Sequence, residues 1–292
     1  MQRNNAIKIL LSVFLLIKKY PKLILPIFAV FFSFYIYESK IARANATYMG
    51  VPESIGFSLN TFTRVFRNSD FMIGYSDYRG NPLWVTYALT PVPKDAKRLK
   101  RPSSFYKDWR NITQIEHSDY THSGYDRGHM APNYAISRLY GKSAQLETFD
   151  MTNITPQKPN LNRKLWQRLE KAEVSEFTKY FDKVWVFTGP IFDEKKETLK
   201  NSKYVEIPDA FFKIYIGVSK NKEAKTLAFI MPQNVKGNES FMQFVTSIDE
   251  IEKQTGLDFL PNLEDTLETK LEKSKESEAW HLKAVATRPS RY

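Results

Sequence analysis

The sequence predicts an α+β fold in one compact domain, because short β-rich runs alternate with turn residues and with stretches of helical periodicity. Residues 71–76 and 83–90 are β-rich and flank the turn-forming segment 77–82, which indicates a hairpin or meander. Further strand-like runs, several of them bounded by Gly or Pro, cover residues 183–188, 211–218 and 226–231.

The amino end has the layout of a targeting segment. Residues 1–22 are cationic, residues 23–37 carry no charge, and Ala44-Asn45-Ala46 follows as an A-x-A site. A cleavable signal peptide and an uncleaved signal anchor both fit residues 1–46. A core helix of a globular domain is disfavoured, because the unbroken apolar run lacks the polar face that a surface helix of a globular protein needs. Fifteen helical residues span roughly 22 Å, which is short of a hydrocarbon core of about 30 Å.

Both targeting interpretations place the lysines on the cytoplasmic side and send most of the chain across a membrane. We therefore expect a periplasmic or secreted protein, or one anchored through residues 23–37. A mitochondrial import sequence is also poor in acids, so a mitochondrial location is a further alternative if the source is eukaryotic.

Helices are expected between the later strands. Apolar side chains recur near helical spacing in residues 162–180. A second helix over 247–255 has Ser247 as N-cap, Glu250 three residues later and Gly256 as a stop signal.

Three regions are predicted along the chain. Residues 1–46 are the signal peptide or anchor, and residues 47–262 form the folded domain. Acids and lysines alternate at helical intervals from 265 to 278, which is typical of a solvated face, so residues 263–292 are predicted to be a charged tail without chemistry.

Composition narrows the chemistry that is available. The 292 residues include no Cys, which excludes disulfides, a cysteine nucleophile, thiolate zinc sites and iron–sulfur clusters. The formal net charge is +11, of which residues 1–46 supply +6. The remaining body is only mildly basic, which suits phosphate binding but is also common among other proteins.

The four histidines are the first place to look for a catalytic group. His117, His122 and His281 stand outside any polar constellation, and we expect structural or surface roles for them. His129 lies in the run DRGHMAPN, residues 126–133, beside a cation and a glycine. A neutral imidazole accepts protons near pH 7 and an arginine can fork onto phosphate, although a lone histidine is more often a structural hydrogen-bonding group.

A second cluster is rich in amides and begins with NITPQ, residues 153–157. LNRKLWQRLE follows at 161–170. Mg²⁺ prefers oxygen ligands and retains much of its water, so an amide oxygen with help from a carboxylate is chemically sensible. Asn162 and Glu170 lie about 12 Å apart along a continuous helix, so both cannot ligate one ion directly. The alternatives are a helix cap for Asn162 and a surface position for Glu170.

Together these motifs resemble the DNA/RNA non-specific endonuclease family, the ββα-metal (His-Me finger) nucleases that include endonuclease G-like enzymes. Later blocks, among them VFTGPIF at 186–192 and IPDAFFK at 207–213, extend the resemblance over about residues 74–261. The resemblance implies a central, mainly antiparallel sheet flanked by helices.

The resemblance also assigns roles residue by residue. It makes His129 the general base, Asn162 the one protein side chain on a hydrated Mg²⁺, with Mn²⁺ as a substitute, and Glu170 the group that orients waters on that ion. Arg127 and one upstream arginine, Arg101 or else Arg98, assist at phosphate. It further implies that Asn153 and Gln157 shape the loop, and leaves a metal role open for Asn160.

The expected activity is Mg²⁺-dependent hydrolysis of DNA and RNA phosphodiester bonds to 5′-phosphate products. Two alternatives are a catalytically silent nucleic-acid-binding protein of the same fold and a membrane-proximal phosphodiesterase. The resemblance adds the expectation of a homodimer, and the sequence leaves open whether an inhibitor protein exists.

Overall fold

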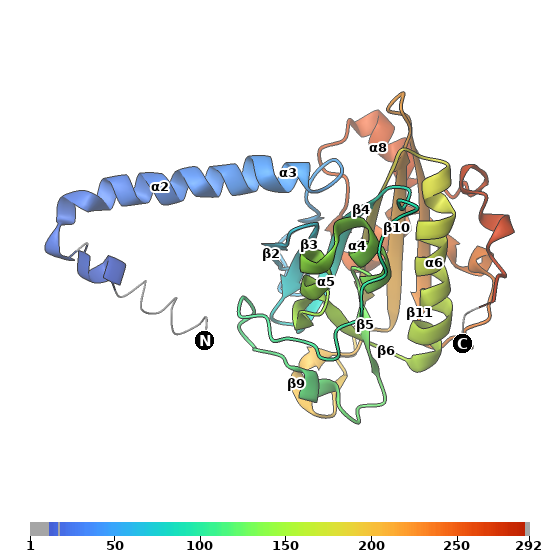
Figure 1. Cartoon of the computed structure of the whole chain (residues 1–292), viewed down its shortest axis with the longest axis horizontal. Coiled ribbons are helices and arrows are strands. Elements are labelled where there is room, and N and C mark those ends of the chain that lie inside the picture. The colour runs from blue at the N-terminus through green and yellow to red at the C-terminus, as the bar shows by residue number, and fades with distance from the viewer. Residues whose placement is uncertain (1–11, 17, 290–292) are drawn as a thin grey trace. The chain divides into compact units, whose positions relative to one another are not determined.

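The computed structural model describes residues 12–16 and 18–289, and the chain divides into two units between Asn45 and Ala46. In the first unit, η1 (Pro21–Leu23), α2 (Ile24–Ile36), the π-helical η2 (Tyr37–Ala42) and α3 (Arg43–Asn45) form one helix (Figure 1).

That helix, Pro21–Asn45, has 25 residues, a mean hydropathy of 1.4 in its most apolar window, and no buried residue in that window. At 1.5 Å per residue it is about 37 Å long, which exceeds a hydrocarbon core. The helix is longer than the uncharged run 23–37, because it continues through Glu38, Lys40 and Arg43 to Asn45. The segment is apolar and long enough to cross a membrane.

The second unit is built on a seven-stranded sheet in which every neighbouring pair is antiparallel. The strand order is β12-β11-β10-β7-β4-β3-β2, which confirms the predicted α+β class (Figure 1). Their bounds are β2 Arg64–Arg67, β3 Phe71–Ser76, β4 Asn81–Leu89, β7 Lys183–Ile191, β10 Ala210–Val218, β11 Ala224–Pro232 and β12 Val245–Thr246.

The sheet separates two apolar cores because alternate side chains of its central strands point to opposite faces. Phe211 packs on Trp166 in the first core, with ring centroids 5.7 Å apart. Its neighbour Phe212 packs on Phe259 in the second core at 5.1 Å. The near-continuous burial of β4 and β10 follows from this two-sided packing.

Two further strands and a helix, which lie outside the seven-stranded sheet, pack on the first core. β5 (Asp126–His129) pairs antiparallel with β6 (Ile154–Gln157), and η5 (Leu161–Trp166) and α6 (Gln167–Ser175) follow. The predicted helix over 162–180 is thus divided, since its first turn is π-helical and η6 (Phe177–Lys179) ends it. Between the two strands lie α4 (Asn133–Tyr140), α5 (Lys142–Glu147) and η4 (Met151–Asn153).

The carboxyl-terminal part corrects the expectation of a solvated tail. α7 (Ile248–Thr255) has the predicted caps: Glu250 N donates to Ser247 Oγ at 3.3 Å, and Gly256 is left-handed with φ +69°. After α8 (Asp265–Glu272), however, Trp280 is fully buried, and its Nε1 donates to the Thr226 carbonyl at 3.2 Å. Apolar residues between the charges therefore anchor this segment in the core.

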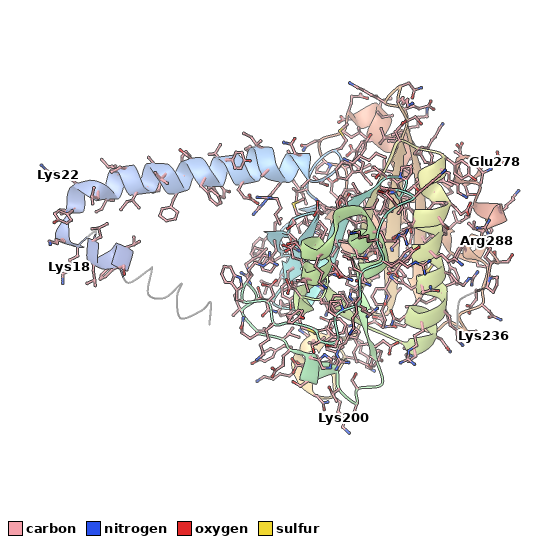
Figure 2. The ribbon with its side chains drawn as sticks, viewed as in Figure 1. Lys18, Lys22, Lys200, Lys236, Glu278 and Arg288 are labelled. Carbon is pink, nitrogen blue, oxygen red and sulfur yellow. The ribbon has the colours of Figure 1, made fainter. Side chains whose placement is uncertain are left out.

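The end of this segment is also held against the folded domain. Arg288, labelled in Figure 2, pairs with Glu176 at 2.6 Å near the end of α6. The remaining short elements are β1 (Glu53–Ser54), β13 (Leu257–Asp258), β8 (Thr198–Leu199), β9 (Ser202–Glu206), η3 (His117–Tyr120), η7 (Phe241–Phe244), η8 (Glu278–Trp280) and η9 (Leu282–Ala284).

Candidate active site

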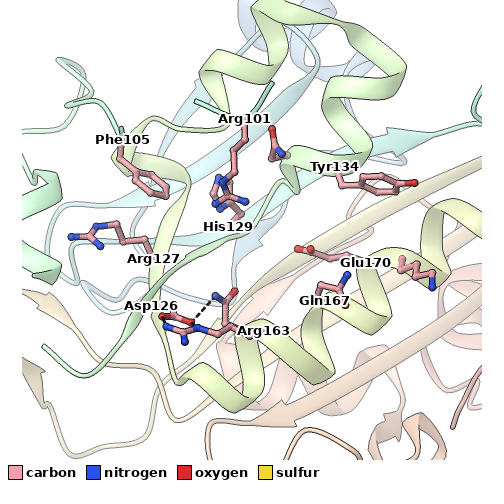
Figure 3. A pocket seen from close by; sticks show the side chains of 12 residues that line it. Arg101, Phe105, Asp126, Arg127, His129, Tyr134, Arg163, Gln167 and Glu170 are labelled. Carbon is pink, nitrogen blue, oxygen red and sulfur yellow. Dashed lines mark hydrogen bonds and ion pairs between the residues drawn. The ribbon is translucent and has the colours of Figure 1, made fainter. Parts of the chain in front are cut away.

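A cavity of about 540 Å³ lies between β5 and the η5–α6 helix, and it brings all five predicted site residues together (Figure 3). Arg98, the alternative upstream arginine, is not among the residues that line it. The lining residues are Arg101, Phe105, Asp126, Arg127, His129, Asn133, Tyr134, Asn162, Arg163, Gln167, Glu170 and Lys171.

His129, at the end of β5, is 8% exposed and packs against two aromatic rings. Its ring centroid lies 4.8 Å from that of Phe149 and 5.4 Å from that of Phe105. Its Nε2 is buried and has no hydrogen-bond partner among the described residues. Burial, reinforced by the charge of Arg101, lowers the pKa of His129 to about 3, so the imidazole is neutral at pH 7.

Asn162 is the second residue of η5 and faces the strand pair rather than capping the helix. Its Nδ2 donates to Asp126 Oδ2 at 3.0 Å. Arg163 holds the same carboxylate through Nε at 2.8 Å and Nη2 at 2.6 Å. Because the amide nitrogen is used in this way, the Asn162 amide oxygen is the group left to accept a ligand.

Glu170 projects into the cavity from α6 (Figure 3). Burial and the neighbouring Glu173 carboxylate raise the pKa of Glu170 to about 7, while Lys213 and Arg101 oppose the shift. A carboxyl group that titrates near neutral pH inside a polar cavity is typical of a functional site. The surface position considered from the sequence is therefore wrong for Glu170.

The two arginines differ in how they are held. Arg127 donates to the His117 carbonyl from Nε at 3.2 Å and from Nη2 at 2.6 Å, and also to Thr121 Oγ1 at 3.0 Å. Arg101 lies with its Cζ 5.2 Å from the Phe149 ring centroid. Both arginines line the cavity, so both can reach an anion bound in it.

The loop residues act as scaffold, as expected for Asn153. Its side chain donates to the carbonyls of Ala131 at 3.0 Å and Thr148 at 2.9 Å, and accepts from Ala131 N at 2.8 Å. Gln157 fills the space that a side chain at Gly128 would need, so the glycine is required for packing between β5 and β6 rather than for access to a ligand.

The other polar candidates lie outside the cavity. Asn160 is exposed and does not line it, so nothing in the geometry favours the metal role left open for this residue. Among the remaining histidines, His281 stacks on Tyr180 with ring centroids 4.2 Å apart, and His117 contributes its carbonyl to Arg127.

Sequence reasoning missed several lining residues, although a signal was present for some of them. Arg163, Gln167 and Lys171 recur every four residues and so share one face of the helix with Glu170. Asp126 belongs to the same motif as His129. Tyr134 and Phe105 carried no signal, because folding alone brings them to the cavity.

An antiparallel strand pair followed by a helix, with a strand histidine and a helix amide in one cavity, defines the ββα-metal nuclease fold. The family model for DNA/RNA non-specific endonucleases matches residues 52–266, and the chain belongs to this family. It is therefore a hydrolase, a non-specific DNA/RNA endonuclease.

Named relatives agree with this assignment. Endonuclease G, mitochondrial, of Bos taurus is 28% identical over 227 residues, which cover 73% of this chain and 75% of that one. The mitochondrial nuclease of Saccharomyces cerevisiae is 30% identical over 212 residues, covering 65% of this chain and 64% of its own. A crystal structure of the EndoG/EndoGI complex is similar with a TM-score of 0.60 and 27% identity, over 72% of this chain and 90% of that one.

Proposed function

We propose that the chain hydrolyses DNA and RNA phosphodiester bonds in a Mg²⁺-dependent reaction that leaves 5′-phosphate products. The observation that carries this proposal is the convergence, in one cavity, of a neutral His129 imidazole and an Asn162 amide oxygen oriented by Asp126.

His129 acts as the general base. Its imidazole accepts a proton from a water molecule, whose oxygen then forms a bond to phosphorus while the bond to the 3′ oxygen breaks in line with it. The departing 3′ oxygen takes up a proton from solvent. The phosphate stays on the 5′ end of the downstream strand. A base is available over a wide pH range, since the depressed pKa keeps the imidazole neutral well below pH 7.

Asn162 would hold the cation through its amide oxygen. Glu170, further along the same helix, would orient water molecules on the cation. The donors suit Mg²⁺, which prefers oxygen and keeps most of its water, and Mn²⁺ can use the same donors. When bound, the cation neutralises charge on the phosphate and on the departing oxygen. Asp126 keeps the Asn162 nitrogen turned away from that ligand.

Arg101 and Arg127 bind the phosphate oxygens from the strand side of the cavity. Contacts of this kind carry no information about base identity. Because the nucleophile is water rather than the ribose 2′ hydroxyl, the mechanism works on both DNA and RNA.

The direct test compares His129→Ala with His122→Ala, a matched histidine outside the cavity. Plasmid DNA, single-stranded RNA and a phospholipid are each incubated with the protein and Mg²⁺. We expect His129→Ala to lose about 10²–10⁴-fold in nuclease rate while still binding nucleic acid. An unchanged nuclease rate in His129→Ala would remove His129 from the mechanism. If the parent cleaves neither nucleic acid, the result supports a silent binding protein, and cleavage of the phospholipid supports the membrane-proximal phosphodiesterase.

We also propose that the amino-terminal helix is a targeting segment that places the nuclease across or at a membrane. Its length and hydropathy support this, and the two relatives described above are mitochondrial by name. Mass spectrometry of the native protein shows whether this segment is cleaved. A mature start near Thr47 indicates cleavage, and retention of Met1 indicates an anchor. Light scattering tests the homodimer that the family resemblance implies.

A further inference from the structure

An acidic cluster lies at the junction of α7, β13 and α8 and takes no part in the chemistry described above. Its five members are Asp249, Glu252, Asp258, Glu268 and Glu272. Their apolar neighbours Ile251, Leu257 and Leu271 belong to the second core. The residues beside the cavity, such as Met130 and Leu161, belong to the first, so the cluster is separate from the active site.

The carboxylate oxygens are close enough to share a cation. Those of Asp249, Glu252 and Glu272 lie within 4.8 Å of one another, and those of Asp258, Glu268 and Glu272 meet the same condition. Oxygens that bind one Ca²⁺ at 2.3–2.6 Å are separated by at most about 5 Å. Glu272 belongs to both groups and is therefore the centre of the cluster.

Glu272 supplies a second and independent observation. The residue is only 8% exposed, and its Oε1 is buried without a hydrogen-bond partner among the described residues. A buried polar atom without a protein partner is costly, and such atoms are usually satisfied by an ion or a water molecule. In this respect Glu272 differs from Glu252, whose Oε1 accepts a hydrogen bond from Phe259 N at 2.9 Å.

The electrostatics point the same way. Within the described part of the chain, none of the five carboxylates forms an ion pair with a lysine or arginine. The cluster therefore needs positive charge from outside the chain, as bound protons or as a cation.

We propose that this acidic cluster is a structural divalent-cation site, of the all-oxygen kind that takes Ca²⁺, centred on Glu272. A bound ion would join α7, β13 and α8 and so fasten α8 and the segment after it to the second core. The site draws its ligands from three elements and is partly open to solvent, which is typical of sites with millimolar rather than nanomolar affinity.

The experiment measures thermal unfolding of the full chain after chelation and then in rising CaCl₂. We expect Tm to rise by roughly 3 °C or more at an ion concentration ten times the Kd. Glu272→Gln should abolish the Ca²⁺-dependent rise, because it replaces the one carboxylate that belongs to both groups of ligands. Asp258→Asn provides the same test at β13.

Two controls separate this site from other effects. Glu278→Gln removes an exposed acid from the same segment (Figure 2) and should leave the Ca²⁺ response intact. Asn162→Ala removes the proposed catalytic ligand and should also leave it intact. No saturable rise in the parent, a rise that survives in Glu272→Gln and Asp258→Asn, or one lost only in Asn162→Ala would overturn the proposal.

Discussion

Replacing Asp126 with alanine tests how the cavity orients its amide. In the folded chain the Asp126 carboxylate accepts three hydrogen bonds, one from Asn162 Nδ2 at 3.0 Å and two from Arg163 at 2.6 and 2.8 Å. Without the carboxylate, Asn162 loses the contact that keeps its oxygen turned toward the ligand. Asp126→Ala should therefore weaken the response to Mg²⁺ without removing any group that contacts substrate.

The magnitude follows from the kind of contact that is lost. A partner that orients a metal ligand typically contributes 10–100-fold to metal affinity or activity, or about 1.4–2.7 kcal/mol. The Arg163 ion pair contributes little to stability, since the Arg163 side chain is 62% exposed and exposed pairs are worth about 0–1 kcal/mol. Most of the effect should therefore appear in the Mg²⁺ dependence and little in Tm.

The assay measures initial plasmid cleavage rates over a range of Mg²⁺ concentrations, alongside Tm. Arg163→Gln is the matched control, because it removes the ion pair but keeps the contact between Asp126 and Asn162. We expect a 10–100-fold higher half-saturating Mg²⁺ for Asp126→Ala and a much smaller change for the control. Equal Mg²⁺ dependence in parent and Asp126→Ala would refute the orienting role.

Three further predictions concern stability. Lys213→Met leaves the fully buried Glu173 carboxylate without its cation and should lower the free energy of unfolding in urea by about 3–5 kcal/mol. Adding Glu173→Leu should restore most of that free energy. Equal stability of the single and double variants would count against an uncompensated charge. Gly128→Ala places a methyl group against the buried Gln157 and should lower the free energy of unfolding by about 1–3 kcal/mol, and adding Gln157→Ala should restore it. An unaffected Tm in Gly128→Ala would contradict tight packing at this position. The pKa of His129 is about 3 in the folded chain, below the usual value near 6.5, so the free energy of unfolding should fall by up to about 5 kcal/mol as the pH drops from 6.5 toward 3. In an acid titration followed by circular dichroism, His129→Asn should therefore unfold at a lower pH than the parent. An unshifted midpoint would contradict the depressed pKa.

Local signals in the sequence account for much of the fold. The run over 71–76 coincides with β3, and the caps at Ser247 and Gly256 bound α7 as predicted. These features depend on neighbouring residues, which pattern and capping rules describe well. His129 was recognisable for a similar reason, because its motif is contiguous.

Features that depend on distant residues were not predictable in the same way. Asp126 and Asn162 are thirty-six positions apart, and only the pairing of β5 with β6 brings them together. The burial of Trp280 under a run of charges reverses the prediction made from local composition. The pKa values of His129 and Glu170 likewise depend on burial that only the folded chain creates.

The most direct test of the account is a crystal structure of the His129→Ala chain with an oligonucleotide and Mn²⁺. We expect anomalous density for Mn²⁺ at the Asn162 amide oxygen and a phosphate that bridges it to Arg101 or Arg127. The position left by the imidazole should face the same phosphorus. Mn²⁺ and phosphate bound elsewhere, with this cavity holding neither, would contradict the account.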